Sequence, residues 1–196
     1  MNVPGMNDQR DLEGLSALVT GATSGIGRAA AEELGRHGAE IVVHGRDADR
    51  GSAVASTITA AGGKARFVAA DLTDPAQVDY LAEQAGPVDV LVNNAGFSWF
   101  GPTAELDVAT FDRLFAANVR SAYFLVAGLA PKMAARGSGS IISLGSMAGQ
   151  IGLAGGAASG PFITFNQCRS RRPSRTACTS TSSAVPSPPR PSDCLA

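Results

Sequence analysis

The chain has 196 residues, of which 44% are hydrophobic and 17% are charged, and its formal net charge is −1. This length fits one domain with an adequate core, and the near-neutral charge gives no overall attraction to nucleic acid or to an anionic membrane. No run approaches the roughly 18 apolar residues of a membrane-spanning helix and residues 1–11 have no signal-peptide core, so we expect a cytoplasmic protein without a membrane partner.

Short apolar runs alternate with helical patterns from residue 12 onward. The runs predict strands over residues 15–19, 41–43 and 66–69. Apolar residues at helical spacing predict a first helix with Ile26, Ala30 and Leu34 on its buried face, ending at Gly38. The same pattern predicts a second helix with Val54, Ile58 and Ala61 on its buried face. Asp74 and Pro75 predict the start of a third helix, whose buried face holds Val78, Leu81, Ala82 and Ala85.

The pattern continues with a fourth strand over residues 88–92, a long helix and a fifth strand over residues 140–144. The long helix is marked by Phe111, Leu114, Val119, Ala122 and Val126. Strands that alternate with helices at this spacing predict an α/β fold, a Rossmann-type, doubly wound parallel sheet with helices on both faces. Ligands of such sheets bind at the carboxyl ends of the strands, where the winding reverses.

The composition changes after residue 157. Residues 158–196 are rich in Ser, Pro, Arg and Thr, and they contain all three cysteines, which lack metal-ligand spacing. Such a segment buries too little apolar surface to offset the entropy lost on ordering. We therefore expect a domain over residues 12–157, disordered segments at 1–11 and 158–196, and no metal site.

A glycine-rich turn, residues 20–27, joins the first predicted strand to the first helix. Gly21 permits a tight turn, Gly25 lets the backbone approach a pyrophosphate, and Gly27 allows close packing of the helix. The helix N-terminus offers unpaired N–H groups and a partial positive charge to phosphates. The alternative is a plain helix-entry turn. The predicted cofactor-binding residues of the turn are Thr20, Gly21, Ser24, Gly25, Ile26 and Gly27.

Asn93-Asn94-Ala95-Gly96 follows the fourth predicted strand. With the T-G-x-x-x-G-I-G turn, this motif resembles the short-chain dehydrogenase/reductase family over roughly residues 12–157. The resemblance implies an oxidoreductase that interconverts a small-molecule alcohol and a carbonyl with a nicotinamide cofactor. It also implies cofactor contacts from Asp71, Leu72, Asn93, Ala95 and Gly96, with Asp71 as the acid of the adenine pocket. Family members are commonly homo-oligomers that associate through two long helices.

The resemblance assigns catalytic roles to Asn118 and Ser146, the latter polarising the substrate carbonyl. The family also has a tyrosine about thirteen residues beyond the serine and a lysine four residues further on. The tyrosine is the general acid or base, and the lysine lowers its pKa and holds the nicotinamide ribose. Ser159 and Ile163 stand at those positions, and no tyrosine of the chain has a lysine four residues later. We therefore expect the chain as written to be inactive.

The cofactor preference is read after the second predicted strand, where the sequence is His44-Gly45-Arg46. The resemblance implies that a family member with a preference for NAD would have an acidic residue at the position that aligns with Gly45. Because an arginine can pair with a 2′-phosphate, Arg46 favours NADP, with NAD as the alternative cofactor. A solvated Arg46 beside Asp47 is the alternative interpretation.

Three explanations fit the departure from the family after residue 157. The chain is a non-catalytic dinucleotide-binding module, its tail has a new function, or its reading frame shifts near Ala158. Codons read in the shifted frame permit a sequence that resembles the end of the family's active-site helix and its sixth strand, which favours the third explanation. Four arginines within residues 169–175 would bind phosphate without specificity, but no aromatic residues lie among them for base stacking. We do not expect nucleic acid as a partner.

Overall fold

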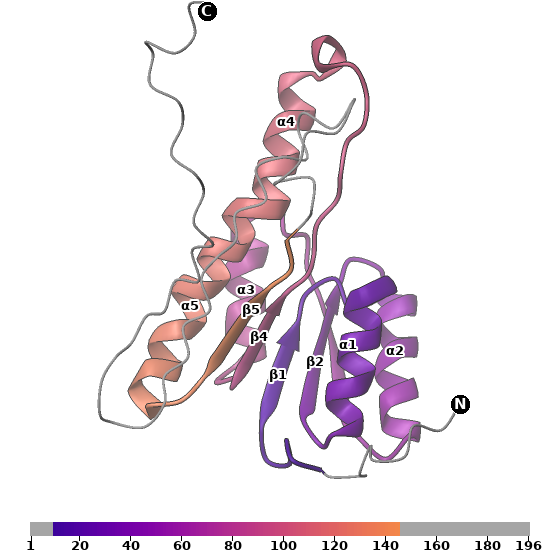
Figure 1. Ribbon diagram of the computed structural model, residues 1–196, viewed down its shortest axis with the longest axis vertical. Helices are drawn as coiled ribbons and strands as arrows, with labels where there is room; N and C mark the ends of the chain where they lie inside the picture. The colour runs from indigo at the N-terminus through magenta and orange to yellow at the C-terminus, as the bar shows by residue number, and fades with distance from the viewer. Residues whose placement is uncertain (1–9, 146–196) are drawn as a thin grey trace, which may run out of the picture.

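The computed structural model describes residues 10–145, which form a five-stranded parallel sheet with helices on both faces (Figure 1). The strand order is β3-β2-β1-β4-β5. The strands are β1 (Ser16–Val19), β2 (Glu40–Gly45), β3 (Lys64–Ala69), β4 (Val90–Asn93) and β5 (Ser140–Ser143). The chain winds outward from β1 to β3 and then returns to the other side of β1 for β4 and β5. This confirms the predicted doubly wound, Rossmann-type fold, in which the winding reverses between β1 and β4.

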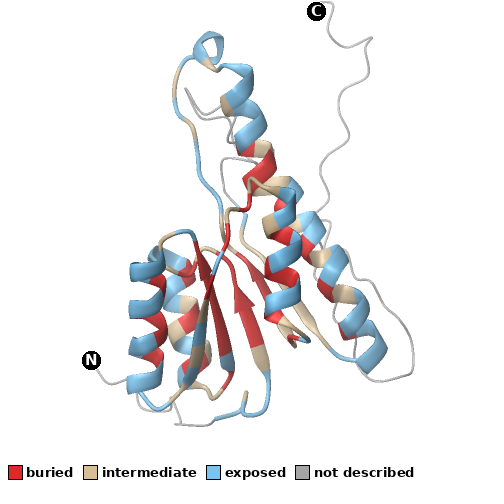
Figure 2. Ribbon diagram, turned by 180° about the vertical axis from the view of Figure 1, so that it is seen from behind, coloured by how far each residue is buried: buried red, intermediate tan, exposed pale blue. Residues whose placement is uncertain are grey.

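Two pairs of helices cover the two faces of the sheet (Figure 1). One pair is α1 (Gly25–Arg36) and α2 (Ala48–Ala60), and the other is α3 (Pro75–Ala85) and α5 (Ser121–Arg136). In β1, Ala17 and Val19 belong to the core under α1 and α2, whereas Leu18 belongs to the core under α3 and α5. Strand side chains alternate between faces, so a strand covered on both sides is apolar throughout. Figure 2 shows this as buried strands between helices with exposed outer sides.

The predicted face of α1 is partly correct: Leu34 packs against the core and Ala30 is half-buried, but Ile26 is not buried. Ile26 is 69% exposed, and the buried residues are Gly27, Ala31 and Gly35. The helix lies so close to its neighbours that a β-carbon at Gly35 would approach the Ile58 Cγ2 atom of α2 to 2.7 Å. The close approach of α1 to α2 therefore requires small residues at their interface. The spacing of apolar residues had instead selected the residues that precede them in the sequence.

The other two early helices agree more closely with the sequence pattern. In α2, Val54 and Ile58 are buried as predicted, but Ala61 is exposed because the helix ends at Ala60. In α3 the four predicted residues are all buried. Its predicted start is also confirmed, since Asp74 is the N-cap and accepts a hydrogen bond from the Ala76 N–H group, with Pro75 in the first turn.

The long helix contains a π-helical turn that the sequence did not predict. A short 3-10 turn (Thr103–Glu105) precedes α4 (Val108–Phe115), the π turn (Ala116–Arg120) and α5. Of the five residues that marked this helix in the sequence, only Leu114 is buried; Phe111 is exposed and the others are half-buried. The buried residues of α5 are Ser121, Leu125, Leu129 and Met133. A π turn inserts an extra residue, so the buried stripe departs from the period of an α-helix.

By length and composition, the helical segment Val108–Arg136 is long and apolar enough to cross a membrane. The segment is not a run of 18 apolar residues, because Asp112, Arg113 and Arg120 interrupt it, so the expectation from the sequence still holds for unbroken runs. Within the segment, Leu125, Leu129 and Met133 pack into the core against the sheet and α3. Burial in the core accounts for these three residues, whereas Tyr123 and Phe124 of the same segment are exposed.

The N-terminal boundary of the folded domain lies earlier in the structure than the sequence predicted. Asp11, assigned to a disordered N-terminus, begins a turn in which the Glu13 N–H group donates to the Arg10 carbonyl. The Asp11 carboxylate lies 2.8 Å from Nδ1 of His37. The domain therefore begins at or before Arg10. Ser146 and the predicted tail, 158–196, lie outside the described residues.

Candidate functional site

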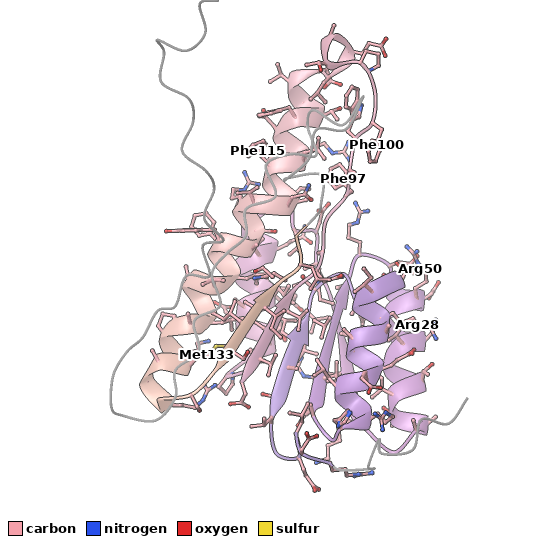
Figure 3. All side chains as sticks on the ribbon, in the orientation of Figure 1. Arg28, Arg50, Phe97, Phe100, Phe115 and Met133 are labelled. Carbon is pink, nitrogen blue, oxygen red and sulfur yellow. The ribbon has the colours of Figure 1, made fainter. Side chains whose placement is uncertain are left out.

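A pocket of about 430 Å³ lies at the carboxyl ends of the strands, on both sides of the point where the winding reverses. Eight of the predicted cofactor-binding residues line it: Gly21, Ser24, Ile26, Arg46, Asp71, Leu72, Ala95 and Gly96. Phe97, one of three aromatic residues that the sequence offered as a possible pocket wall, also lines it, as do Thr23 and Arg50, which were not predicted. In Figure 3, Arg50 lies at the end of α2 nearest the strand ends, and Phe97 lies on the segment that follows β4. The fold thus collects four separate loops around one cavity.

The first turn of α1 opens onto this pocket. Ser24 is the N-cap and makes no side-chain cap hydrogen bond, and the first turn contains no acidic residue. A β-carbon at Gly25 would meet nothing within 4 Å, so the space beside this glycine is open. The leading N–H groups of a helix that lacks a side-chain cap are suited to bind an anion.

Thr20 and Gly27 support the glycine-rich turn from behind and do not line the pocket. The buried Thr20 Oγ1 atom accepts hydrogen bonds from the N–H groups of Asn94 and Ala95, each at 3.0 Å. The Asn94 side chain donates in return to the carbonyls of Thr20 at 2.9 Å and Gly21 at 3.2 Å. A β-carbon at Gly27 would overlap the Asn94 amide and lie 2.5 Å from the Gly21 oxygen. Asn94 was predicted only as part of a motif. Its side chain connects the glycine-rich turn to the end of β4 through these hydrogen bonds.

His44 is a further supporting residue that the sequence did not identify. Its side chain is buried at the end of β2, where Nδ1 accepts a hydrogen bond from the Gly21 N–H group at 3.2 Å. Nε2 lies 3.1 Å from the Ala70 carbonyl oxygen, so Nε2 carries the proton and donates it. Burial lowers the pKa of His44 to about 4, which leaves the imidazole neutral at physiological pH. The ring thereby connects the glycine-rich turn to the end of β3.

The arginines at the pocket edge differ in their partners. Asp47 caps α2 by accepting from the Arg50 N–H group at 3.0 Å, and it accepts from Arg50 Nε at 2.8 Å. Arg46 is exposed, lines the pocket and makes no hydrogen bond or ion pair with any residue in the described part of the chain, 10–145. The exposure of Arg46 also agrees with the alternative interpretation, a solvated Arg46 next to Asp47, although Asp47 itself pairs with Arg50.

Asp71 is held in a fixed orientation on the opposite wall. Its Oδ1 atom accepts from the Thr73 N–H group and from Thr73 Oγ1, both at 2.9 Å. These hydrogen bonds, together with the nearby cations of Arg46 and Arg113, lower the pKa of Asp71, so its carboxylate is ionised. Leu72 beside it is 6% exposed and supplies an apolar wall. An oriented carboxylate next to an apolar surface suits a planar ring with N–H donors at its edge.

The predicted catalytic asparagine lies beside the pocket and does not line it. Asn118 is in the π turn, where its Oδ1 accepts from the Phe97 N–H group at 3.0 Å and its Nδ2 donates to the Phe97 carbonyl at 2.8 Å. It therefore anchors the segment after β4 to the long helix. Ser146, its predicted partner, lies outside the described residues.

Asn93 also turns away from the cavity. Its side chain is 7% exposed, and its Nδ2 donates to Ser143 Oγ at 3.5 Å, while its Oδ1 has no partner among residues 10–145. Over the same residues, no cluster of three or more His, Cys, Asp or Glu side chains could hold a metal ion.

Comparison with known proteins places these features in a family. Residues 16–159 match the sequence profile of the family described as short chain dehydrogenase. The chain is 37% identical over 148 residues to gluconate 5-dehydrogenase of Gluconobacter oxydans, an alignment that covers 74% of this chain and 58% of that relative. The chain thus spans a little over half the length of this curated relative.

Two solved structures extend the comparison to three dimensions. A metagenomic short-chain oxidoreductase in complex with NADP is 42% identical with a TM-score of 0.72, covering 76% of this chain and 72% of that one. A 7α-hydroxysteroid dehydrogenase complexed with NADH and a 7-oxo bile acid is 33% identical with a TM-score of 0.74, covering 79% and 62%. Proteins similar to this chain thus include one solved with NADP and one solved with NADH.

Proposed function

The chain belongs to the short-chain dehydrogenase family, and from this premise we propose that its pocket binds NADP(H) for the interconversion of a small-molecule alcohol and a carbonyl in the cytoplasm. The observation that supports NADP over NAD is Arg46. This guanidinium lines the pocket and makes no hydrogen bond or ion pair among residues 10–145, although its charge acts on Asp71, while its neighbour Arg50 is already paired with Asp47. A 2′-phosphate would give Arg46 a directly bonded anion.

The remaining residues of the pocket fit the other parts of a dinucleotide. The oriented carboxylate of Asp71 and the apolar side chain of Leu72 suit an adenine ring. The uncapped N-terminus of α1, with open space at Gly25, suits the pyrophosphate. Gly96 and the Asn118-anchored segment would then lie near the nicotinamide, which gives or takes the hydride when the cofactor is bound.

Turnover by this sequence is a separate question. Ser159 and Ile163 stand where the family has its acid–base tyrosine and its lysine, and a serine hydroxyl is a poor acid near neutral pH. Tyr80 and Tyr123 do not replace them, because they lie on the exposed sides of α3 and α5. We therefore propose that the chain as written binds cofactor weakly at best and has negligible turnover.

Two of the three explanations for the departure after residue 157 concern the dinucleotide site, and they lead to different functions. A shifted reading frame would make the parent protein an ordinary reductase, whereas a genuine Ser159 would make this chain a non-catalytic dinucleotide-binding module. Sequencing the encoding DNA across codons 146–196 decides between them. A single inserted or deleted base that restores a Tyr-x-x-x-Lys frame supports the first, and a DNA sequence that encodes the chain as written supports the second.

The cofactor proposal is tested by titrating the full chain with NADPH and NADH and following nucleotide fluorescence. Replacing Arg46 with Ala should weaken NADPH binding about 10- to 100-fold, the range expected for a lost charge-assisted hydrogen bond, and leave NADH binding unchanged. Arg28→Ala is the matched control, because Arg28 lies on α1, pairs with Glu32 and does not line the pocket. Equal loss of both cofactors in Arg46→Ala, or tighter binding of NADH by the unaltered chain, would contradict the proposal.

A further inference from the structure

Gly45, the last residue of β2, has no room for a side chain. It is buried and lines the pocket, and a β-carbon added to it would overlap the Cγ2 methyl group of Thr23. The same β-carbon would lie 3.2 Å from Thr23 Oγ1 and 3.4 Å from Thr23 Cβ. Thr23 therefore fills the space that any side chain at position 45 would need.

The backbone that carries Thr23 is fixed against β2 at this point. The Ala22 N–H group donates to the His44 carbonyl at 2.8 Å, and the Gly21 N–H group donates to the His44 ring at 3.2 Å. The turn therefore cannot move away from β2 without breaking two hydrogen bonds. Rotation of the Thr23 side chain offers limited relief, because both heavy atoms on its β-carbon already lie toward Gly45 and a β-branched residue has few alternative rotamers.

Position 45 is important for the choice of cofactor. It lies 20 residues beyond Gly25 (45 − 25), which is the spacing at which Rossmann folds carry an acid that binds the ribose hydroxyls of NAD. We propose that Thr23 is a specificity-determining residue: its methyl group keeps position 45 a glycine, and this excludes the acid that would select NAD. The inference rests on the proposed function, since it concerns the same dinucleotide pocket.

Steric exclusion and charge then act in the same direction. With no carboxylate at position 45, the pocket wall next to the ribose presents the Arg46 guanidinium, which makes no hydrogen bond or ion pair among residues 10–145. An acid at position 45 would both repel a 2′-phosphate and neutralise Arg46. Thr23 therefore preserves the NADP preference through position 45, and this effect depends on which residue occupies that position.

The test is a double-mutant cycle between the two positions, with NADPH and NADH affinities and thermal melting measured on the full chain. Gly45→Ala adds only a β-carbon and should weaken NADPH binding at least about tenfold, as overpacking does. In the Thr23→Ala background the same change should cost less than about threefold. Thr23→Ser, which keeps the hydroxyl and loses the methyl, should relieve Gly45→Ala in the same way.

Gly45→Asp gives the second part of the test. On its own it should abolish NADPH binding without improving NADH binding, whereas Thr23→Ala with Gly45→Asp should improve NADH binding at least about tenfold over Thr23→Ala. The inference is overturned if Gly45→Ala costs the same in both backgrounds, or if Gly45→Asp alone gains NADH affinity. If the unaltered chain binds neither cofactor, the proposed function fails. The melting temperatures still report the Thr23–Gly45 coupling in that case, as a loss in Gly45→Ala that Thr23→Ala restores.

Discussion

The buried His44 ring makes the stability of this fold depend on pH above the range in which carboxylates titrate. The ring is 2% exposed and bonded as a neutral imidazole between the Gly21 N–H group and the Ala70 carbonyl. Burial lowers its pKa from 6.5 to about 4. Between these two pKa values the unfolded chain binds a proton that the folded chain does not, so the free energy of unfolding rises with pH. The contribution is complete above about pH 6.5 and is lost as the pH falls toward 4.

The size of the effect follows from the same two values. The interval from 6.5 to about 4, at about 1.4 kcal/mol for each pH unit, corresponds to about 3 kcal/mol. This is a large part of the roughly 5–15 kcal/mol by which single domains are stable. With a urea m-value of about 2 kcal/mol per M, the unfolding midpoint should fall by about 1.5 M between pH 7 and pH 4.

The assay compares urea unfolding of the unaltered chain and of His44→Gln at several pH values between 4 and 7. Glutamine offers an amide donor and acceptor but does not titrate, so this variant should lack the extra 3 kcal/mol of pH dependence. Comparing the two proteins cancels the contribution of groups such as Asp71. The pKa of Asp71 is lowered, so its stabilising contribution is lost only in more acidic solution. The reasoning would be refuted if the unfolding free energy of the two proteins depended on pH in the same way. It would also be refuted if an NMR titration of the His44 imidazole had its midpoint near pH 6.5.

Two further predictions concern residues that hold the scaffold. Thr20→Val keeps the shape of the side chain but leaves the N–H groups of Asn94 and Ala95 without their acceptor. The free energy of unfolding should therefore fall by roughly 2–3 kcal/mol. Thr20→Ser keeps the hydroxyl and should stay within about 1 kcal/mol of the original. A chemical denaturation series that ranks the two variants equally would contradict this. Asp74→Ala removes the N-cap of α3 and should cost about 1 kcal/mol, with Asp74→Asn recovering most of it; no change in melting temperature for Asp74→Ala would show that the cap is dispensable.

The order of strands and helices could be predicted from the sequence because it depends on local periodicity. The four predicted core residues of α3 are all buried, since a regular apolar stripe with a clear N-cap leaves one way to place the helix. The prediction for α1 was only partly correct: Leu34 packs against the core, but the contact with α2 and the sheet is so close that the buried positions are the small residues Gly27, Ala31 and Gly35. The π turn around Asn118 also escaped prediction, since the hydrogen bonds that fix it come from Phe97, 21 residues earlier.

The motifs in the sequence determined where the pocket would be. The glycine-rich turn, Asp71, Arg46 and the segment after β4 all follow strands of one parallel sheet, so the fold must bring them to one edge. What each residue does there was decided only by tertiary contacts. Thr20 supports the turn and does not line the cavity, because its hydroxyl meets N–H groups more than 70 residues away. Thr23 and Gly45 are neighbours because a β1–α1 turn and the end of β2 meet in space, a contact between residues 22 positions apart that no local pattern in the sequence records.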